Sequence, residues 1–266
     1  MPDLTPPRID VRLDDSRAGA RIAHVTIDNR ARLNSMGSAL MEQFVAAFDD
    51  LGKDESLRAV VLRGAGEKAF VGGADIDEMA AIDGERRGRE FITRVHRVCH
   101  AVREIGVPVI ARLHGFTLGA GLELAAACDL RVAADDARFG MPEVRLGIPS
   151  VVEAALLPGL IGWGRARQML LLGDTYGAAE MADWGLLEFV EPHDAMDACI
   201  ERCLTSILAC GPQALRQQKA LIRQWENLPM RDAVKAGIDA FAASWRTDEP
   251  SRMMTAFRTQ KKAHKG

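Results

Sequence analysis

Long apolar runs are missing from this sequence of 266 residues, which has no stretch of about 18 apolar residues that could span a membrane. The N-terminal segment MPDLTPPRID also lacks the apolar centre of a secretory signal. We therefore expect a cytoplasmic protein without a membrane partner.

Cysteines are few, odd in number and irregularly spaced, and no CxxC pair occurs. This pattern does not support a disulfide framework or a zinc site. We expect reduced thiols that pack as small apolar side chains. The cysteines are Cys99, Cys128, Cys199, Cys203 and Cys210.

An excess of positive charge is missing as well. The chain has 34 Lys and Arg against 37 Asp and Glu, a formal net charge of -3, and only its last residues, KKAHKG, are locally basic. Binding to phosphate backbones requires a basic surface. The sequence therefore predicts no nucleic-acid partner.

What the chain does have is enough apolar sequence, 48%, to bury a substantial core. Apolar periodicity predicts that short strands alternate with amphipathic helices, which favours an α/β fold with parallel strands. The predicted strands are 9–14, 21–28, 58–64, 108–115 and 129–134, and the predicted helices 35–54 and 84–105.

From about residue 192 the strand pattern ends, and the remaining segments all have helical spacing. We therefore predict two parts: an α/β core that holds the active site, residues 1–195, and a helical C-terminal region, residues 196–266.

Two glycine-rich loops stand out, and each follows a predicted strand. In KAFVGGADIDEM, Gly72 and Gly73 precede Ala74; in GAGLELAAACD, Ala120 stands between two glycines at the start of a helix. Free N–H groups at such positions can face developing negative charge. Two of them aimed at one oxygen would form an oxyanion hole. Ordinary strand–helix loops are the alternative.

Two glutamates lie near these loops. Glu123 lies in the apolar run LELAAAC, where burial would raise its pKa and make it suitable for proton transfer. Glu143 lies in a loop between Pro142 and Gly147. Alternatively, Glu123 complements the helix dipole or faces solvent. For Glu143 the alternative is an ordinary surface residue of a loop.

Three histidines are weaker candidates. His114 directly precedes the second loop, but no serine or cysteine nucleophile with an acidic partner is evident. His96 and His100 are four residues apart on a predicted helix, yet HRVCH lacks the glutamate of an HExxH motif. We expect a helix surface there and no metal.

Taken together, GGADIDEM, GFTLGAGLELAAACDLRVA and ARFGMPEVRLGIP resemble the crotonase superfamily of enoyl-CoA hydratases and isomerases, with the two glutamates of its hydratases. IDNRARLNSM and AFRTQKKA extend the resemblance over nearly the whole chain. It implies a crotonase-like ββα spiral core and a helical C-terminal region that covers CoA and forms trimers, often paired into hexamers.

The resemblance also implies the chemistry. The N–H groups of Ala74 and Ala120 would hold the thioester oxygen, although many relatives have glycine at position 120. Glu123 and Glu143 would hold a water over the β-carbon. We expect Glu123 to act as the base, and Glu143 to start protonated and protonate the α-carbon. No cofactor is implied beyond the CoA of the substrate.

Further residues match the CoA-binding positions of the family, the last two on C-terminal helices, where a neighbouring subunit often completes the site. These positions are Gly72, Asp75, Ile76, Arg32, Phe241 and Lys261. Two departures affect them: Asp77 stands where lysine is frequent, and Gln260 stands at the usual basic position, so that Lys261 either substitutes or the contact is lost. Solvated surface charges are the alternative for Arg32 and Lys261.

The segment IPSVVEAALLP departs from the GAGGTQRL-like sequence of common hydratases. Val151, Val152 and Glu153 are expected to shape the acyl pocket and to restrict the acyl group, with methylthioacryloyl-CoA as one hypothesis. A Δ3-Δ2 enoyl-CoA isomerase, an acyl-CoA hydrolase or decarboxylase, and a catalytically silent binding protein are the alternative functions.

Overall fold

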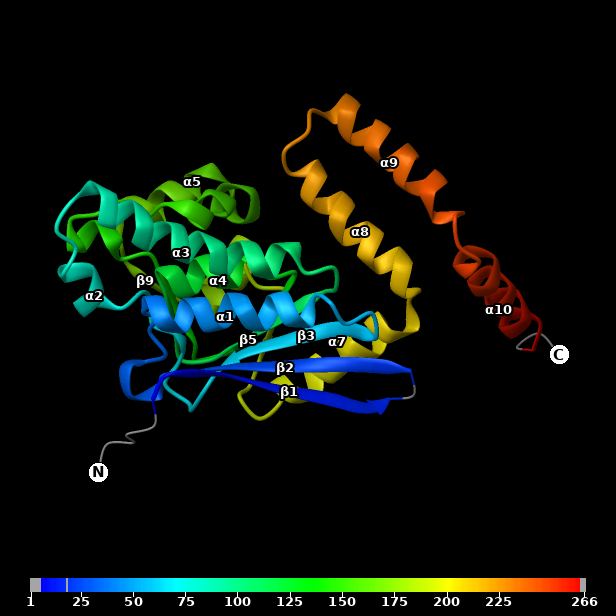
Figure 1. Ribbon diagram of the computed structural model, residues 1–266, viewed down its shortest axis with the longest axis horizontal. Coiled ribbons are helices and arrows are strands. Elements are labelled where there is room, and N and C mark those ends of the chain that lie inside the picture. Colours follow the sequence, from blue (N-terminus) through cyan, green and yellow to red (C-terminus); the bar gives the residue numbers. More distant parts are fainter. Residues whose placement is uncertain (1–5, 18, 264–266) are drawn as a thin grey trace.

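The computed structural model describes residues 6–17 and 19–263, whose strands form two sheets (Figure 1). In the larger sheet the first two strands are antiparallel and all other neighbours are parallel. Its spatial order is β1 (Arg8–Arg17), β2 (Ala20–Asp28), β3 (Leu57–Gly64), β5 (Val109–Leu113), β7 (Leu130–Ala134) and β10 (Phe189–Glu191). Each strand predicted from the sequence is present in this sheet.

A second sheet, which the sequence did not predict, consists of three-residue strands. Its order is β4 (Ala69–Val71), β6 (Phe116–Leu118), β8 (Arg138–Gly140) and β9 (Thr175–Gly177). The chain places one strand in each sheet and then forms a helix, as in β5, β6 and the following α4 (Ala120–Ala127). The ββα spiral expected from the resemblance is therefore confirmed.

Helices α1 (Ser38–Leu51) and α3 (Glu85–Glu104) match the two predicted amphipathic helices and pack against each other. Their apolar stripes, including Phe44 and Phe91, are buried. Helix α4 differs, because all residues of it after Ala120 are buried. It is the central helix beneath the candidate site.

From Met196 to Ala263 all described elements are helices, as predicted for the C-terminal region. Helix α7 lies beside the larger sheet, whereas α9 and α10 extend away from it (Figure 1). Where the chain divides into a core and a C-terminal region stays a prediction. The helices are α5 (Leu157–Leu172), α6 (Ala178–Trp184), α7 (Met196–Ala209), α8 (Pro212–Trp225), α9 (Met230–Ser244) and α10 (Glu249–Ala263).

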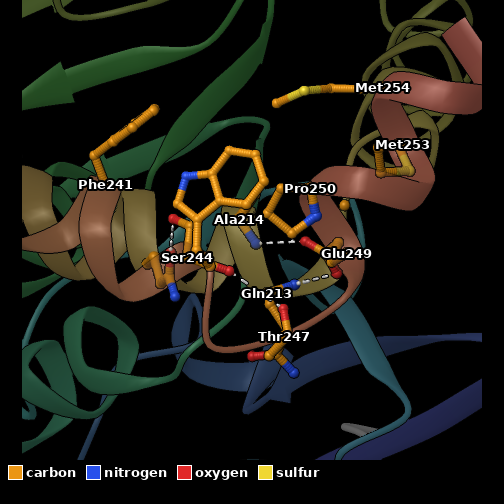
Figure 2. Close-up of a pocket in the computed structure, with 12 residues that line it drawn as sticks. Gln213, Ala214, Phe241, Ser244, Thr247, Glu249, Pro250, Met253 and Met254 are labelled. Carbon is orange, nitrogen blue, oxygen red and sulfur yellow. Dashed lines mark hydrogen bonds between the residues drawn. The ribbon is translucent and has the colours of Figure 1, made fainter.

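Two buried charged side chains hold α8 and α10 in place, one on each helix. Lys219 of α8 donates hydrogen bonds to the carbonyl oxygens of Val102 (3.0 Å) and Val107 (2.9 Å) and pairs with Asp129 at 2.7 Å. Glu249 of α10 accepts hydrogen bonds from the backbone N–H groups at the start of α8, as Figure 2 shows.

Within residues 6–17 and 19–263, no helix is long and apolar enough to cross a membrane.

Candidate active site

A cavity of about 520 Å³ opens where the short strands of the second sheet end. Ala74 follows β4, Ala120 follows β6, and Glu143 follows β8, so three successive turns of the spiral each bring one residue to the same place. Glu123 reaches the cavity from α4. The structure therefore brings all four predicted catalytic residues together.

The two glycine-rich loops lie side by side. Gly73 and Gly119 have φ values of 122° and 52°, which strongly favour glycine. A Cβ at Gly119 would lie 4.0 Å from Cα of Gly73, and a Cβ at Gly73 would lie 3.5 Å from the carbonyl oxygen of Leu118. The loops are therefore in contact directly before Ala74 and Ala120.

The N–H groups of both alanines are available. In the first loop, Gly72 and Asp75 donate to Leu33 (2.8 Å) and Met36 (3.1 Å), and the N–H of Ala74 has no acceptor among residues 6–17 and 19–263. Ala120 is the first residue of α4 and so has no intrahelical acceptor.

Gly121 explains why this helix begins with small residues. A Cβ there would lie 2.1 Å from the carbonyl oxygen of Val71, so only glycine lets α4 pack this closely on β4. This contact fixes the helix start, and with it Ala120, beside the first loop.

Glu123 is 4% exposed, and its Oε1 accepts a 3.3 Å hydrogen bond from the N–H of Ala154. Burial, with smaller contributions from the charges of Glu143 and Glu153, raises its pKa to about 8. The pattern LELAAAC predicted this raised pKa, and the structure confirms it. This pKa favours the protonated form of Glu123 in the free protein, and our expectation that Glu143 starts protonated stays a prediction.

Glu143 begins the 3-10 helix η2 (Glu143–Leu146). Its Oε2 accepts a 2.7 Å hydrogen bond from the hydroxyl of Ser150, and its Oε1 lies against Gly119. One carboxyl group is thus hydrogen-bonded at the cavity wall beside the second loop, and the other is buried and has a raised pKa. Such a pair can accept a proton at one side and donate one at the other.

The rest of the wall is mainly apolar, which favours an apolar group next to the two carboxyls. It includes the α3 residues Phe91, Ile92 and Val95, together with Leu146 at the end of η2 and the loop residues Ile148 and Val151. Of the three residues expected to shape the acyl pocket, only Val151 lines the cavity. Val152 and Glu153 do not, because the chain turns inward after Val151.

The CoA candidates near the first loop fall into two groups. Gly72 and Ile76 line the cavity, and Ile76 is largely exposed at its edge. Arg32 lies in the adjacent 3-10 helix η1 (Arg30–Arg32) and pairs with Asp75 at 2.7 Å and with Asp77. Asp75 also accepts from the N–H of Glu78 at the start of α2 (Ile76–Ala80). A CoA phosphate at Arg32 would compete with these carboxylates.

Phe241 and Lys261 lie elsewhere. Phe241 is exposed on α9 and borders a separate pocket of about 280 Å³ with Trp245 and Met254, shown in Figure 2. Lys261 is exposed on α10. Within the described part of one chain neither lines the main cavity, so their contact with CoA stays a prediction that requires a neighbouring subunit.

The histidines lie outside the cavity. His114 is fully buried, and burial together with the charges of Arg112 and Arg63 lowers its pKa to about 4. It therefore stays neutral at pH 7. His96 and His100 lie on α3 with ring centroids 5.4 Å apart, and no group of three metal-ligating side chains was found among the described residues.

Two partners of the glutamates, the hydroxyl of Ser150 and the N–H of Ala154, were not predicted from the sequence. Both lie in IPSVVEAALLP, where the departure from the common hydratase sequence was the available signal. A serine hydroxyl and a backbone N–H carry no pattern of their own, so only their positions in space identify these roles.

Comparisons with known proteins agree with this geometry. Residues 17–265 match the family model described as "Enoyl-CoA hydratase/isomerase". The chain is 34% identical over 244 residues to a short-chain-enoyl-CoA hydratase of Clostridium acetobutylicum, covering 91% of this chain and 93% of the relative. It is 32% identical over 246 residues to a crotonyl-CoA hydratase of Syntrophomonas wolfei, covering 92% and 94%.

Solved structures show the same fold. An enoyl-CoA hydratase of Mycobacterium smegmatis superposes with a TM-score of 0.90 at 29% identity, covering 96% of this chain and 97% of that one. One from Bacillus anthracis superposes with a TM-score of 0.87 at 29% identity, covering 94% and 96%.

Proposed function

The chain belongs to the enoyl-CoA hydratase/isomerase family, and we propose that it adds water across the double bond of a short 2-enoyl-CoA thioester by two-glutamate catalysis. It is a hydro-lyase of the enoyl-CoA hydratase type, with a 3-hydroxyacyl-CoA as the product. The observation that carries the two-glutamate proposal is the common cavity of Glu123 and Glu143, where burial raises the pKa of Glu123 to about 8.

In this mechanism the thioester oxygen accepts hydrogen bonds from the N–H groups of Ala74 and Ala120. Support comes from the contact between the two loops and from the absence of another acceptor for Ala74 within the described residues. Negative charge develops on that oxygen as water attacks the β-carbon. Fixed donors stabilise this charge without reorganisation, which is worth roughly 3–4 kcal/mol per donor.

The two glutamates then share the proton transfers. The carboxyl group without the proton accepts one from the attacking water, and the protonated one donates to the α-carbon, so that H and OH are added and the pair still has one proton. The two groups titrate as a pair. The mechanism therefore depends on one proton per pair, and it needs no cofactor or metal beyond the CoA of the substrate.

The apolar wall supports a short acyl group. The two curated relatives above are named for short-chain enoyl-CoA and crotonyl-CoA hydration. Val151, on the segment that departs from common hydratases, adds a branched side chain to the same cavity. We therefore propose crotonyl-CoA as a substrate and retain methylthioacryloyl-CoA as a hypothesis for the specialised acyl group.

Assembly into trimers, singly or paired as hexamers, is part of the proposal. Large apolar side chains are exposed along α9 and α10, away from the core, among them Ile238, Phe241 and Phe257. A neighbouring subunit that covers them would bury apolar surface and bring C-terminal residues near another chain's CoA. Sedimentation measurements of the purified chain test this assembly.

A product assay tests the proposed function. Incubation of the purified protein with crotonyl-CoA in H₂¹⁸O should give 3-hydroxybutyryl-CoA with one ¹⁸O. A shifted double bond, free CoA or CO₂ would instead identify an isomerase, a hydrolase or a decarboxylase. CoA binding without turnover of crotonyl-CoA, longer enoyl-CoAs or methylthioacryloyl-CoA would identify a silent binding protein. Equal rates on all three would contradict a specialised acyl pocket.

A further inference from the structure

A third carboxylate lies behind the two catalytic ones. Glu153 in the 3-10 helix η3 (Val152–Leu156) is 7% exposed and does not line the cavity. Its Oε1 lies 2.8 Å from Nδ1 of His96 on α3, and its Oε2 has no hydrogen-bond partner among residues 6–17 and 19–263. Burial of a carboxylate lowers the stability of the fold unless the group is paired, so a structural role for Glu153 is expected.

The backbone around Glu153 is strained. Val152 has a φ of 38°, a region that a β-branched residue rarely occupies. The strained turn places Val151 on the cavity wall and Glu153 in the interior. It also brings the N–H of the next residue, Ala154, to Oε1 of Glu123. The segment therefore requires an anchor, and the bond between Glu153 and His96 connects it to α3.

The ionisable groups that face Glu123 come from three elements. Glu143 lies on η2, Glu153 on η3, and Cys99 on α3, while β4 and β6 contribute none. The Cys99 thiol is buried, and burial followed by the charges of Glu153 and Glu123 raises its pKa. Glu123, Glu153 and Cys99 are all buried, so charges on the two carboxylates are poorly screened by water.

We propose that Glu153 and His96 form a positioning pair for the catalytic carboxyls, which holds η3 so that the N–H of Ala154 binds Oε1 of Glu123. The charge of Glu153 adds a smaller electrostatic effect on Glu123. The role for catalysis rests on the proposed hydratase function. His96 is half-exposed, with 48% of its side chain accessible, and so connects this buried pair to the surface.

The charge of Glu153 changes the pKa of Glu123 in a direction that can be tested. A negative charge at Glu153 disfavours a second one at Glu123 and so raises the pKa of Glu123. In Glu153→Gln this contribution is lost. The pKa of Glu123 should fall, and the basic limb of the pH profile of kcat/KM, which reports loss of the last proton of the pair in the free enzyme, should move to lower pH.

The experiment compares Glu153→Gln, His96→Leu and His96→Asn with His100→Asn, a matched control one helical turn away on the same face of α3. His96→Leu should lower kcat for crotonyl-CoA by about 10-fold with little change in KM, since an unanchored η3 misplaces Glu123. Asparagine can place its side-chain N–H near the position of Nδ1, so His96→Asn should restore most of the activity. The control should behave as wild type.

A double variant separates the pair from general destabilisation. If His96 acts through Glu153, His96→Leu combined with Glu153→Gln should match Glu153→Gln alone within about twofold, since interacting residues are not additive. Multiplication of the two single effects would contradict the pair. An unchanged basic limb in Glu153→Gln would contradict the electrostatic role.

An infrared titration of the Glu123 carboxyl group in the free protein keeps this inference separate from the proposed function. The midpoint should be lower in Glu153→Gln than in wild type whether or not the protein hydrates crotonyl-CoA. An inactive wild type with this shift would overturn the hydratase proposal and keep the electrostatic pair. An active wild type without the shift would overturn the pair alone.

Discussion

Glu143 and Gly119 are in such close contact that a Cβ at Gly119 would lie 2.4 Å from Oε1 of Glu143. Gly119, which precedes the proposed oxyanion donor Ala120, is therefore also in contact with Glu143, the proposed catalytic carboxylate. One residue without a side chain couples the position of Ala120 to that of Glu143.

Replacement of Gly119 tests whether the N–H of Ala120 and the carboxylate of Glu143 depend on each other's position. Gly119→Ala places a Cβ against Glu143 and strains a backbone with a φ of 52°. We expect kcat/KM for crotonyl-CoA to fall by about 100-fold or more, because both the N–H donor and the carboxylate move. Gly159→Ala is the control, since a Cβ there would meet no atom within 4 Å. Equal activity of both variants would contradict the coupling.

The hydroxyl of Ser150 holds Oε2 of Glu143 at 2.7 Å. Ser150→Ala should lower kcat by about 10-fold, the scale of one lost hydrogen bond. Ser206→Ala removes a hydroxyl that, among the described residues, donates to the carbonyl oxygen of Arg202 on α7, and it should leave kcat unchanged. A wild-type rate in Ser150→Ala would show that Glu143 needs no such support. Steady-state kinetics with crotonyl-CoA measure both variants.

The raised pKa of Glu123 predicts how stability depends on pH. The unfolded chain releases this proton near the ordinary glutamate pKa of 4.5, whereas the folded protein holds it to about 8. Below pH 4.5 Glu123 is protonated in both the folded and the unfolded chain, so it does not reduce the free energy of unfolding. This free energy falls as the pH rises from 4.5 towards 8. Glu123→Gln does not titrate, so its stability relative to wild type should increase over this range by a few kcal/mol. Urea unfolding at about pH 5, 7 and 9 measures the difference, and a constant difference would contradict the assigned pKa.

Much of the fold was predictable, because long elements carry a periodic pattern. The alternation of 21–28 and the apolar stripe of 84–105 predicted β2 and α3 to within a few residues. The second sheet was not predicted, since three residues are too few to show alternation. Its strands pair only because the larger sheet and α4 already position them.

The site was predictable to the extent that it depends on residue type. Glu123 stood out because an apolar helix leaves little room for a carboxylate, and its burial is confirmed. The resting position of the proton was not predictable, because it depends on how deeply each glutamate is buried. Glu153 was expected at the acyl pocket, and only the strained backbone at Val152 explains why it faces the interior.

The central claim is that two carboxyl groups share the proton transfers of hydration, and the most direct measurement is kcat/KM for crotonyl-CoA hydration in Glu123→Gln and Glu143→Gln. Glu180→Gln, at an exposed position on α6, is the control. Each of the first two variants should lose about 100-fold or more while the control keeps the wild-type value. Near-wild-type hydration by either Glu123→Gln or Glu143→Gln would contradict the two-carboxyl account.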